Sequence, residues 1–376
     1  MCWRTGSWLM FRGNEKMKAA VISLRSKSSQ WIIEAMKSYF DEVDDIDLKD
    51  IEVRTSTHGL ILKYKGGKLP EYDCVYAKGS FRFPLLLKSV AEVLSPKCYM
   101  PLKPEAFTVG PDKWLTYLSL QKNGVPMPAT YLSPTLDIAK KILKEVTYPV
   151  IMKFPSGTQG KGVMYAGDFA AASSMLDALS TLNQAVIIQE YIETDGTDMR
   201  LIVAGDEVVA AMRRIAVSEE KRANIHAGGK GVAFEPDEIT KRIAIKTAHV
   251  VGADICAVDL LPSAKGPLVI EVNLSPGLQG ITKATDTNVA DKLAKFIYKR
   301  TQDYILKKSS SDSSSVFREM GIEENGEKGA TELITTLEFR GQRVLLPESV
   351  TRLARLNDKD EYAVKLEGKS ICIKKL

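Results

Sequence analysis

The sequence predicts an α/β layer at the N-terminus, an α+β region after it and a small β-rich module at the C-terminus. Short apolar runs alternate with helical patterns over residues 17–105, as strands and helices do in a parallel α/β layer. Residues 148–306 instead carry paired strand patterns with helices between them. Residues 307–330 are rich in Ser, Glu and Gly, and strand patterns return after them, so we expect a disordered linker before a further module.

The composition is that of a globular protein in a reducing compartment. Of the 376 residues, 44% are hydrophobic and 26% are charged, and the net charge of +5 suits an anionic partner such as a nucleotide without arguing for nucleic acid. The five cysteines are scattered, and only three histidines are present, which argues against a zinc site. No run approaches the ~18 apolar residues of a membrane span. We therefore expect a cytoplasmic protein with no membrane partner, in which residues 1–16 form a non-core extension.

The first layer is expected over residues 17–109. KAAVISL and YDCVYAK are typical of strands, and SSQWIIEAMKSYF and RFPLLLKSVAEVL are typical of amphipathic helices. The next segment, GPDKWLTYLSLQKNGVPMP, predicts a helix that starts near Pro111 and ends at Gly124, with Pro126 as a stop.

The middle region is expected over residues 110–306. YPVIMKF and QAVIIQEYI predict strands on either side of a helix near 168–182, and RLIVAGDEVVAAMRR predicts a hairpin that turns at Gly205-Asp206. DEITKRIAIKTAHVVG predicts a helix, AVDLLPSAKGPLVIEVN a buried hairpin, and residues 288–306 a last helix.

A glycine-rich segment follows the strand that ends in Lys153. FPSGTQGKGV at 154–163 has Gly157, Gly160 and Gly162 within six residues, and such a loop exposes backbone N–H groups to phosphates. It is neither a Walker A loop nor a dinucleotide-binding fingerprint. A buried lysine before it would require an anion. The alternatives are a flexible turn and a lysine that extends to solvent.

The buried hairpin carries three oxygen-bearing side chains. Glu271 and Asn273 are two residues apart on a strand, so they point to one face. Folding about 263–266 puts Asp259 opposite residue 270 or 271. Two carboxylates and an amide are the ligands that Mg²⁺ takes together with substrate phosphates. The alternative is a group of solvated carboxylates at strand ends, because burying unpaired carboxylates costs several kcal/mol each.

A cationic set accompanies these groups and comprises Arg200, Arg213, Arg214 and Arg222, with Asn224 nearby. Arginine suits phosphate and carboxylate, although a solvated basic strand edge is the alternative. Neighbours on a strand face opposite ways, so at most one of Arg213 and Arg214 points into a given cleft. A phosphate loop, a lysine, a metal site and arginines together indicate ATP-dependent phosphoryl chemistry, and no Ser-His-Asp or Cys-His pairing suggests a covalent nucleophile.

These segments resemble ATP-grasp ligases of the RimK type, which include α-L-glutamate ligases and LysX-like enzymes. The resemblance rests on YPVIMKFPSGTQGKGV, VIIQEYIETDGTDMRLIVAGDEVVAAMRRIA, RANIHAGG and AVDLLPSAKGPLVIEVNLSPGLQGI. It is strong over about 110–300, weaker over 17–109, and absent over 307–376. It implies a pre-ATP-grasp α/β domain at 17–109 and an ATP-grasp domain at 110–306, whose two subdomains divide near 190.

The resemblance also implies roles for individual residues. Those at the ATP phosphates would be Lys113, Lys153, Gly157, Gln159, Gly160 and Gly162. Those near the rest of the nucleotide would be Gln189, Glu190, Tyr191, Ile192, Asp198, Arg222 and Asn224, with Ala223 where the family has a serine. The metal ligands would be Asp259, Glu271 and Asn273, and the substrate side would hold Arg200, Ser275 and Gly277.

The implied reaction joins a carboxylate to an amine at the expense of ATP. The cofactors would be ATP and Mg²⁺, as two ions, with Mn²⁺ as an alternative. An acyl phosphate would form first, and Lys153, Arg213 and Arg222 would stabilise the charge that develops. The resemblance implies glutamate as the amine and a protein or coenzyme that bears a carboxylate as the acceptor.

The C-terminal segment 331–376 resembles a swapped-hairpin module of the AbrB/MazE type. GQRVLLPESVTRLARLNDKDEYAVKLEGKSICIKKL has the order strand, proline, helix, Asp-rich turn, hairpin. The resemblance implies a homo-oligomer, and we favour a dimerisation or docking domain over DNA binding through Arg340, Arg343, Arg352 and Arg355. The alternative function is a DNA-binding regulator that senses a nucleotide or metabolite. The lysines and the metal trio favour catalysis, because a sensor needs no metal site.

Overall fold

The computed structural model describes residues 16–57, 59–79, 82–155, 162–179, 185–216 and 230–319, and shorter stretches from 338 to 375. It forms two units, Met17–Gln302 and a second unit made of the segments that flank it. Apart from Lys16, the expected N-terminal extension lies outside the described residues.

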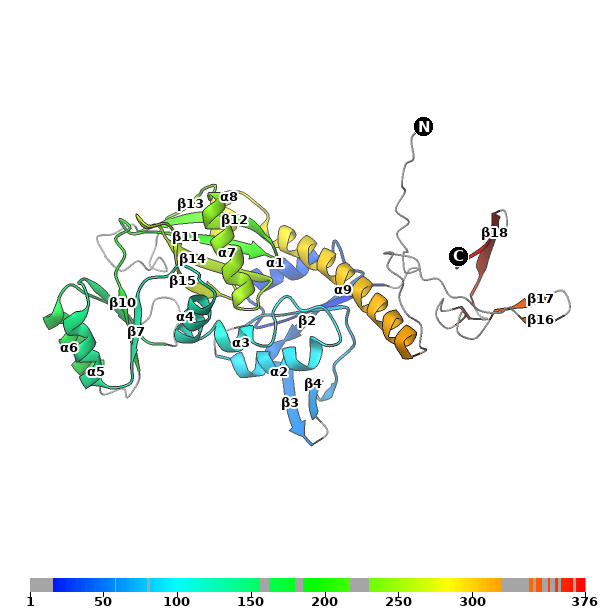
Figure 1. Ribbon diagram of the computed structural model, residues 1–376, viewed down its shortest axis with the longest axis horizontal. Coiled ribbons are helices and arrows are strands. Elements are labelled where there is room, and N and C mark those ends of the chain that lie inside the picture. Colours follow the sequence, from blue (N-terminus) through cyan, green and yellow to red (C-terminus); the bar gives the residue numbers. More distant parts are fainter. Residues whose placement is uncertain are drawn as a thin grey trace. The chain divides into compact units, whose positions relative to one another are not determined.

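The first layer is a parallel sheet, as expected. Its strands β1 (Lys18–Ser23), β2 (Glu42–Asp47) and β6 (Cys74–Ala77) lie in the order β2-β1-β6 (Figure 1). Helices α1 (Lys27–Met36) and α2 (Pro84–Leu94) also lie where the sequence predicts helices. Apart from Lys18, every residue of β1 and β6 is buried, because both strands pack in the interior of the layer.

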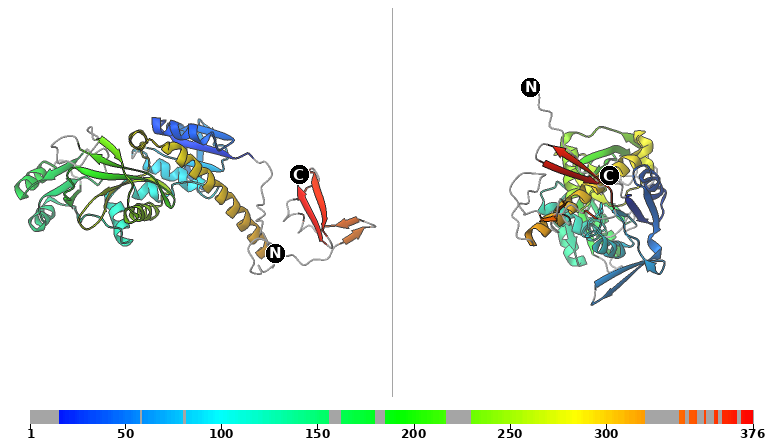
Figure 2. Two further views of the ribbon diagram at one scale, coloured as in Figure 1. Left: turned by 90° about the horizontal axis from the view of Figure 1, so that it is seen from above. Right: turned by 90° about the vertical axis from the view of Figure 1, so that its right-hand side faces the viewer.

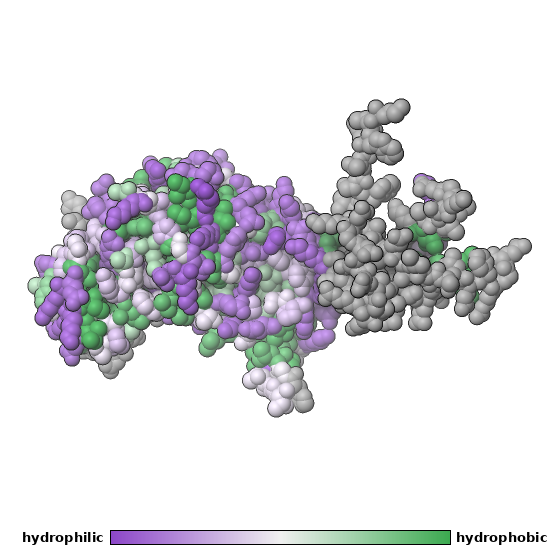
Figure 3. Space-filling model, viewed as in Figure 1, coloured by the Kyte–Doolittle hydropathy of each residue, from purple (hydrophilic) through white to green (hydrophobic). Residues whose placement is uncertain are grey.

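An antiparallel sheet inserted into this layer was not predicted. It contains β3 (Ile51–Ser56), β4 (Gly59–Tyr64) and β5 (Gly67–Lys68), and the short 3₁₀ helix η1 (Leu48–Asp50) precedes it. Hairpin β3–β4 projects from the layer in Figure 1, and Figure 3 shows apolar surface where the hairpin joins it. Exposed apolar side chains of this region include Leu60, Ile61 and Leu85.

The next part of the chain is a four-stranded antiparallel sheet with two helices. Short helix α3 (Ala106–Val109) and helix α4 (Lys113–Lys122) lead into it. Asp112 caps α4, so the helix begins at Lys113, two residues after Pro111. The sheet has the order β7-β10-β8-β9. Its strands are β7 (Thr130–Ser133), β8 (Val150–Lys153), β9 (Val163–Ala166) and β10 (Val186–Glu190). Helices α5 (Leu136–Glu145) and α6 (Phe169–Leu179) pack on it through an apolar core (Figure 1).

A five-stranded antiparallel sheet forms the centre of the unit. Its order is β13-β12-β11-β14-β15. The strands are β11 (Thr197–Ala204), β12 (Glu207–Ile215), β13 (Lys230–Ala233), β14 (Ile255–Leu261) and β15 (Leu268–Asn273), and helix α7 (Glu238–Val250) packs on them. The expected turn between β11 and β12 needs a glycine, because Gly205 has φ 61° and an added Cβ would lie 2.6 Å from the ring of Phe296.

Two irregularities set the register of this sheet. Between β11 and β12, Val203 pairs with Val208 but Ile202 pairs with Ala210, so β12 contains one extra residue. Between β14 and β15, Leu260 pairs with Val269 but Asp259 pairs with Glu271, so Ile270 is the extra residue of β15. Such bulges change which side chains face a given side of the sheet.

The last helices are α8 (Gln279–Thr285) and α9 (Val289–Glu319). The first part of α9 lies against the N-terminal layer (Figure 2). The ring of Tyr298 contacts the rings of Tyr39 and Phe40 there. The prediction of a disordered linker was wrong for residues 307–319, because helix α9 continues to Glu319. Extending an existing helix requires ordering only one residue per hydrogen bond, so a serine-rich stretch can continue it.

The described residues after α9 form two antiparallel hairpins. One joins β16 (Glu338–Arg340) to β17 (Arg343–Leu345), and the other joins β18 (Tyr362–Glu367) to β19 (Ser370–Lys375). Strands β18 and β19 form the hairpin that the sequence predicts at the end of this segment. The side chains of Arg340 and Arg343, and all of Arg352 and Arg355, lie outside what is described. Swapped pairing with a second chain stays a prediction. In the described residues, no helix combines the length and hydropathy needed to cross a membrane.

Candidate active site

Three side chains form a row across one face of the central sheet. Arg200 of β11 lies directly opposite Asp259 of β14, and Asp259 lies directly opposite Glu271 of β15. Residues paired in this way point to the same side of a sheet. The hairpin therefore places Glu271 against Asp259, the second of the two partners that we expected.

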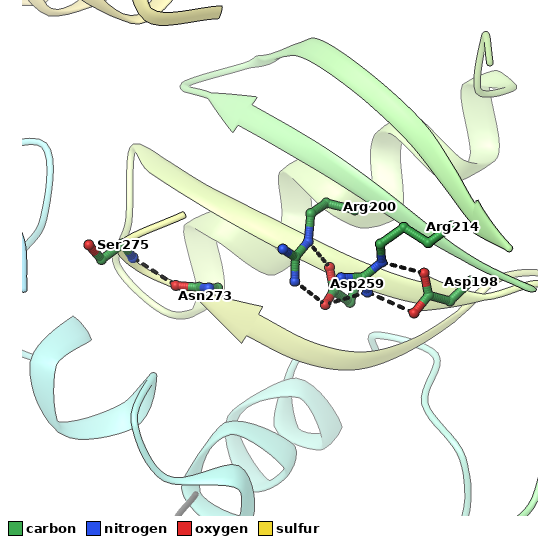
Figure 4. Close-up of polar contacts among 6 residues, drawn as sticks. All are labelled: Asp198, Arg200, Arg214, Asp259, Asn273 and Ser275. Carbon is green, nitrogen blue, oxygen red and sulfur yellow. Dashed lines mark hydrogen bonds and ion pairs between the residues drawn. The ribbon is translucent and has the colours of Figure 1, made fainter. Parts of the chain in front are cut away.

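Asp259 is the centre of a buried network of ion pairs (Figure 4). Its two oxygens accept from Nε and Nη2 of Arg200 at 2.8 and 2.7 Å, and Oδ2 also accepts from Nη2 of Arg214 at 2.9 Å. Arg214 in turn donates to both oxygens of Asp198 at 2.6 and 2.7 Å. All four side chains are at least nine-tenths buried, so each charge depends on its partners for stabilisation.

The two carboxylates of this network differ in their affinity for protons. Burial raises the pKa of Asp198 to about 6, against the opposing effect of Arg214. For Asp259, burial acts in the same direction, but the positive charges of Arg200 and Arg214 outweigh it. The net effect lowers the pKa of Asp259 to about 2. Asp259 therefore stays an anion at neutral pH, as a metal ligand must.

The oxygen donors near Asp259 fit a hard divalent cation. Asn273 lies opposite Ala257, two residues along from the Asp259–Glu271 pair, so its amide is on the same face. Its Oδ1 accepts from the backbone N–H of Ser275 at 2.9 Å, which orients the oxygen and leaves it a second lone pair (Figure 4). Within the described part of the chain, no three His, Cys, Asp or Glu side chains cluster as a metal site. The set is thus two carboxylates and an amide, which suits Mg²⁺ bound jointly by protein and phosphates.

Lys153 ends strand β8 and is buried, as the sequence suggested. Its Nζ donates to the hydroxyl of Tyr117 at 2.7 Å and to Oε1 of Gln189 at 2.8 Å. The Tyr117 hydroxyl donates onward to the carbonyl of Ile270 at 2.8 Å. Among the described residues, Lys153 has neutral hydrogen-bond partners and no ion pair, so its positive charge is available to an anionic ligand.

Lys113 is the first residue of α4 and lies close to the same groups. Its backbone N–H donates to the carbonyl of Pro155 at 3.0 Å, which joins the start of the helix to the start of the glycine-rich segment. Burial lowers the pKa of Lys113, the Glu271 carboxylate opposes this effect, and the charge of Lys153 adds to it. Two lysines and Glu271 are therefore near enough to interact electrostatically.

The expected nucleotide segment begins at the end of β10. Gln189 is buried and donates from Nε2 to Thr130 at 2.7 Å, while Glu190 is exposed and accepts from the N–H of Ala129 at 3.1 Å. Tyr191 and Ile192 are half-buried. The ring of Tyr191 meets that of Tyr165 edge-on at 5.3 Å.

Of the remaining expected residues, some are described by the structure and the others lie outside the described residues. Gly162 has φ 78°, and an added Cβ would lie 2.9 Å from the ring of Phe154, so only glycine fits there. Ser275 is half-buried and Gly277 is exposed, both in the segment after Asn273. Outside the described residues lie Gly157, Gln159, Gly160, Arg222 and Asn224.

Arg213 is not where we expected it. It pairs with Met199 on the opposite face of the sheet, is exposed, and lies 4.9 Å from the ring of Phe234. Arg214, which we had named in the cationic set without giving it a role, takes the inward position opposite Asp198. A regular hairpin turning at Gly205-Asp206 would place Arg213 opposite Asp198. The extra residue in β12 shifts that pairing by one, and the strand sequence carries no glycine to signal it.

Comparisons with known proteins are consistent with this geometry. Residues 110–297 match the model of the RimK-like ATP-grasp domain. A probable alpha-L-glutamate ligase of Nitrosococcus oceani is 36% identical over 290 residues, which cover 75% of this chain and 96% of that protein. A ribosomal protein bS6–L-glutamate ligase of Salmonella schwarzengrund is 36% identical over 250 residues, or 65% of this chain and 83% of the relative.

Solved structures share the fold at low sequence identity. The ATP-grasp ligase PsnB, in complex with a precursor variant, Mg and ADP, gives a TM-score of 0.60 at 17% identity and covers 76% of this chain and 98% of that one. A D-alanine–D-alanine ligase from Bacillus anthracis, in complex with ATP, gives a TM-score of 0.56 at 16% identity and covers 78% of this chain and 99% of that one.

Proposed function

The chain belongs to the RimK-like ATP-grasp family and is an ATP-dependent ligase that forms C–N bonds, and we propose that it adds L-glutamate to an acceptor that bears a carboxylate. The two relatives described above are named glutamate ligases, which supports glutamate as the amine. One of them is named for a ribosomal protein, which supports a protein acceptor over a coenzyme.

The observation that carries the proposal is the set of charges around Asp259 and Glu271. One face of the central sheet presents two carboxylates and the Asn273 amide. Lys113 lies near Glu271, and Lys153 is buried without a carboxylate partner among the described residues. Phosphates of ATP would be held by both lysines, and Mg²⁺ would be held by Asp259, Glu271 and Asn273 together with those phosphates. We propose two such ions, with Mn²⁺ able to replace Mg²⁺.

In the first step, a carboxylate oxygen of the acceptor attacks the γ-phosphorus of ATP. The bond from that phosphorus to the β–γ bridging oxygen breaks, which yields an acyl phosphate and ADP. Bound Mg²⁺ would neutralise charge on the phosphate oxygens during this transfer. Lys153, fixed by Tyr117 and Gln189, supplies a positive charge that needs no reorientation.

In the second step, the amine of glutamate attacks the carbonyl carbon of the acyl phosphate. A tetrahedral intermediate forms, the amine loses a proton, and inorganic phosphate leaves with the C–O bond electrons. We propose that Arg200 faces the oxyanion, because the bonds to Asp259 use its Nε and Nη2 and leave its Nη1 for a further acceptor. We assign Arg214 to holding Asp259 and Asp198 in place, and the role first expected for Arg213 is not proposed again.

The test is ATP hydrolysis that depends on both substrates. Purified protein is incubated with Mg²⁺–ATP, L-glutamate and candidate acceptors, including peptides with a C-terminal glutamate. ADP release and a mass increase of the acceptor by glutamate residues are measured together. Glutamate-dependent mass addition supports the proposal. ADP release with another amino acid in place of glutamate, or no product across a broad acceptor panel, would contradict it.

A further inference from the structure

Lys78 is a buried cation for which the described residues supply no hydrogen-bond acceptor. It directly follows β6, and only 2% of its surface is exposed. Its Nζ makes no hydrogen bond within the described part of the chain and lies 5.7 Å from the centre of the Tyr76 ring. Burial lowers the pKa of Lys78 to about 8. Burying an ammonium group is costly unless an anion pairs with it, so a buried lysine of this kind indicates a ligand.

A second buried polar atom, two residues away along the chain, is also unpaired among the described residues. Tyr76 precedes Lys78 by two residues in an extended segment, so the two side chains point to the same side. The hydroxyl of Tyr76 is buried and has no hydrogen-bond partner there. Both groups are donors, and a carboxylate can accept from more than one donor at once.

The backbone around Lys78 is held firmly. Its N–H donates to the carbonyl of Ile22 at 2.9 Å, which continues the pairing of β1 with β6. A Cβ added to Gly79 would lie 3.0 Å from Leu87 Cδ1 and 3.1 Å from Leu48 Cδ2. The fold therefore fixes the position from which the lysine side chain extends.

This position lies at the carboxyl ends of parallel strands. Ligands of open α/β sheets bind at that edge. The same edge is tied to the segment that follows the candidate metal ligands, because Ser28 in α1, just beyond β1, accepts from the N–H of Leu278 at 2.8 Å. Ser28 also donates to Oε1 of Gln279 at 2.8 Å. The edge that carries Lys78 is thus tied to the start of α8, a few residues after the end of β15.

We propose that Lys78, with the hydroxyl of Tyr76, binds a substrate carboxylate that takes no part in the reaction. The inference rests on the proposed ligase function and extends it, because it gives a carboxylate site outside the phosphate and metal groups. Glutamate carries such carboxylates, and so does an acceptor that ends in glutamate. The chemistry recognised is the same in both cases, and kinetics distinguishes the two sources.

The experiment compares Lys78→Met, Tyr76→Phe and the exposed control Lys63→Met on β4 in the full chain. Glutamate and a peptide acceptor are each varied at saturating levels of the other substrate and of ATP. We expect Lys78→Met to raise the KM of one of them about 10- to 100-fold, the range of a hydrogen bond to a charged group. Tyr76→Phe should raise the same KM by a smaller factor, and Lys63→Met should change neither. An effect on glutamate assigns the site to the donor, and an effect on the peptide assigns it to the acceptor.

A structural role for Lys78 predicts a different result. In that case Lys78→Met lowers the melting temperature and leaves both KM values within twofold of wild type, which overturns the inference. If the wild type shows no turnover, the proposed function fails separately. Calorimetric binding of L-glutamate and of the peptide, in the presence of Mg²⁺–ADP, then compares wild type with Lys78→Met. Binding by wild type that weakens at least tenfold in the variant supports the site, and equal binding or none by either protein overturns it.

Discussion

Arg200 lies directly opposite Asp259 across β11 and β14, and its guanidinium donates to both oxygens of that carboxylate at 2.8 and 2.7 Å. Oδ2 accepts a further bond from Arg214, whereas Oδ1 accepts only one bond from these two arginines. A cation that approaches Asp259 therefore meets a carboxylate whose orientation is already fixed, with Oδ1 the less occupied oxygen. This arrangement makes the proposed metal ligands unequal, because Glu271 lies outside the arginine network.

Asp259→Asn and Glu271→Gln should therefore both abolish turnover but differ in stability. Each change removes a proposed metal ligand, and we expect a loss of activity of about 100-fold or more. Asp259→Asn also leaves buried arginine charge without its partner, which costs about 3–5 kcal/mol. Glu271→Gln should change the free energy of unfolding by about 1 kcal/mol or less. Urea denaturation alongside ADP release checks both quantities, and equal destabilisation by the two variants would contradict the network.

The adjacent arginines provide a matched pair of substitutions. Arg214→Met leaves Asp198 without its buried partner and should destabilise the protein by about 3–5 kcal/mol. Arg213→Met removes an exposed side chain whose contact with Phe234 contributes about 0.5–1 kcal/mol. Turnover should fall sharply in the first variant and little in the second. If Arg213→Met proves the more damaging to ADP release, the register of β12 is not as described.

Tyr117→Phe should weaken ATP binding without removing any charge. The hydroxyl accepts from Lys153 and donates to the Ile270 carbonyl, so its loss leaves a buried acceptor unpaired at a cost of about 1–3 kcal/mol. We expect the KM for ATP to rise about tenfold, because Lys153 loses one of its two positioning contacts. Tyr131→Phe, at an exposed position of β7, is the control and should match wild type. An unchanged KM for ATP in Tyr117→Phe would remove the hydroxyl from this role.

Lys78→Met should stabilise the ligand-free protein in a way that depends on pH. Burial lowers the pKa of Lys78 from 10.5 to about 8, so below pH 8 the folded state holds an unfavourable charge. The difference corresponds to about 3 kcal/mol. As pH rises from 8 to 10.5, the folded lysine loses its proton before the unfolded one does, and the penalty declines. Free energies of unfolding of both proteins at pH 7 to 10 measure the effect, and a gain for Lys78→Met that stays constant over this range contradicts it.

The sequence was sufficient to predict a strand and its pairing where the apolar pattern of the segment matches its burial in the fold. The strand patterns around Asp259 and Glu271 are apolar and the turn between them is short, so their pairing could be placed to within one residue. The N-terminal layer was recognised from β1 and β6, whose residues are almost all buried apolar side chains. Strand β2, EVDDID, was missed because it is a mostly acidic edge strand with a single buried residue.

The position of Arg214 could not be read from the sequence. Alternation along β12 showed that either Arg213 or Arg214 faces inward. Which of the two does so depends on the extra residue of β12, and only its pairing with β11 shows that residue. The network of Asp198, Arg200, Arg214 and Asp259 is also a property of three adjacent strands. Lys78 gave no signal in sequence either, because its burial depends on elements that fold around β6.

The hydrogen bonds from Lys153 to Tyr117 and from Tyr117 to Ile270 have a mechanical consequence. They run from strand β8 of the four-stranded sheet, through α4, to the residue next to Glu271 on the central sheet. The lysine proposed for the phosphates and the carboxylate proposed for the metal cannot move apart along this path without breaking one of two bonds. A displacement of β8 would therefore be transmitted through Tyr117 to β15.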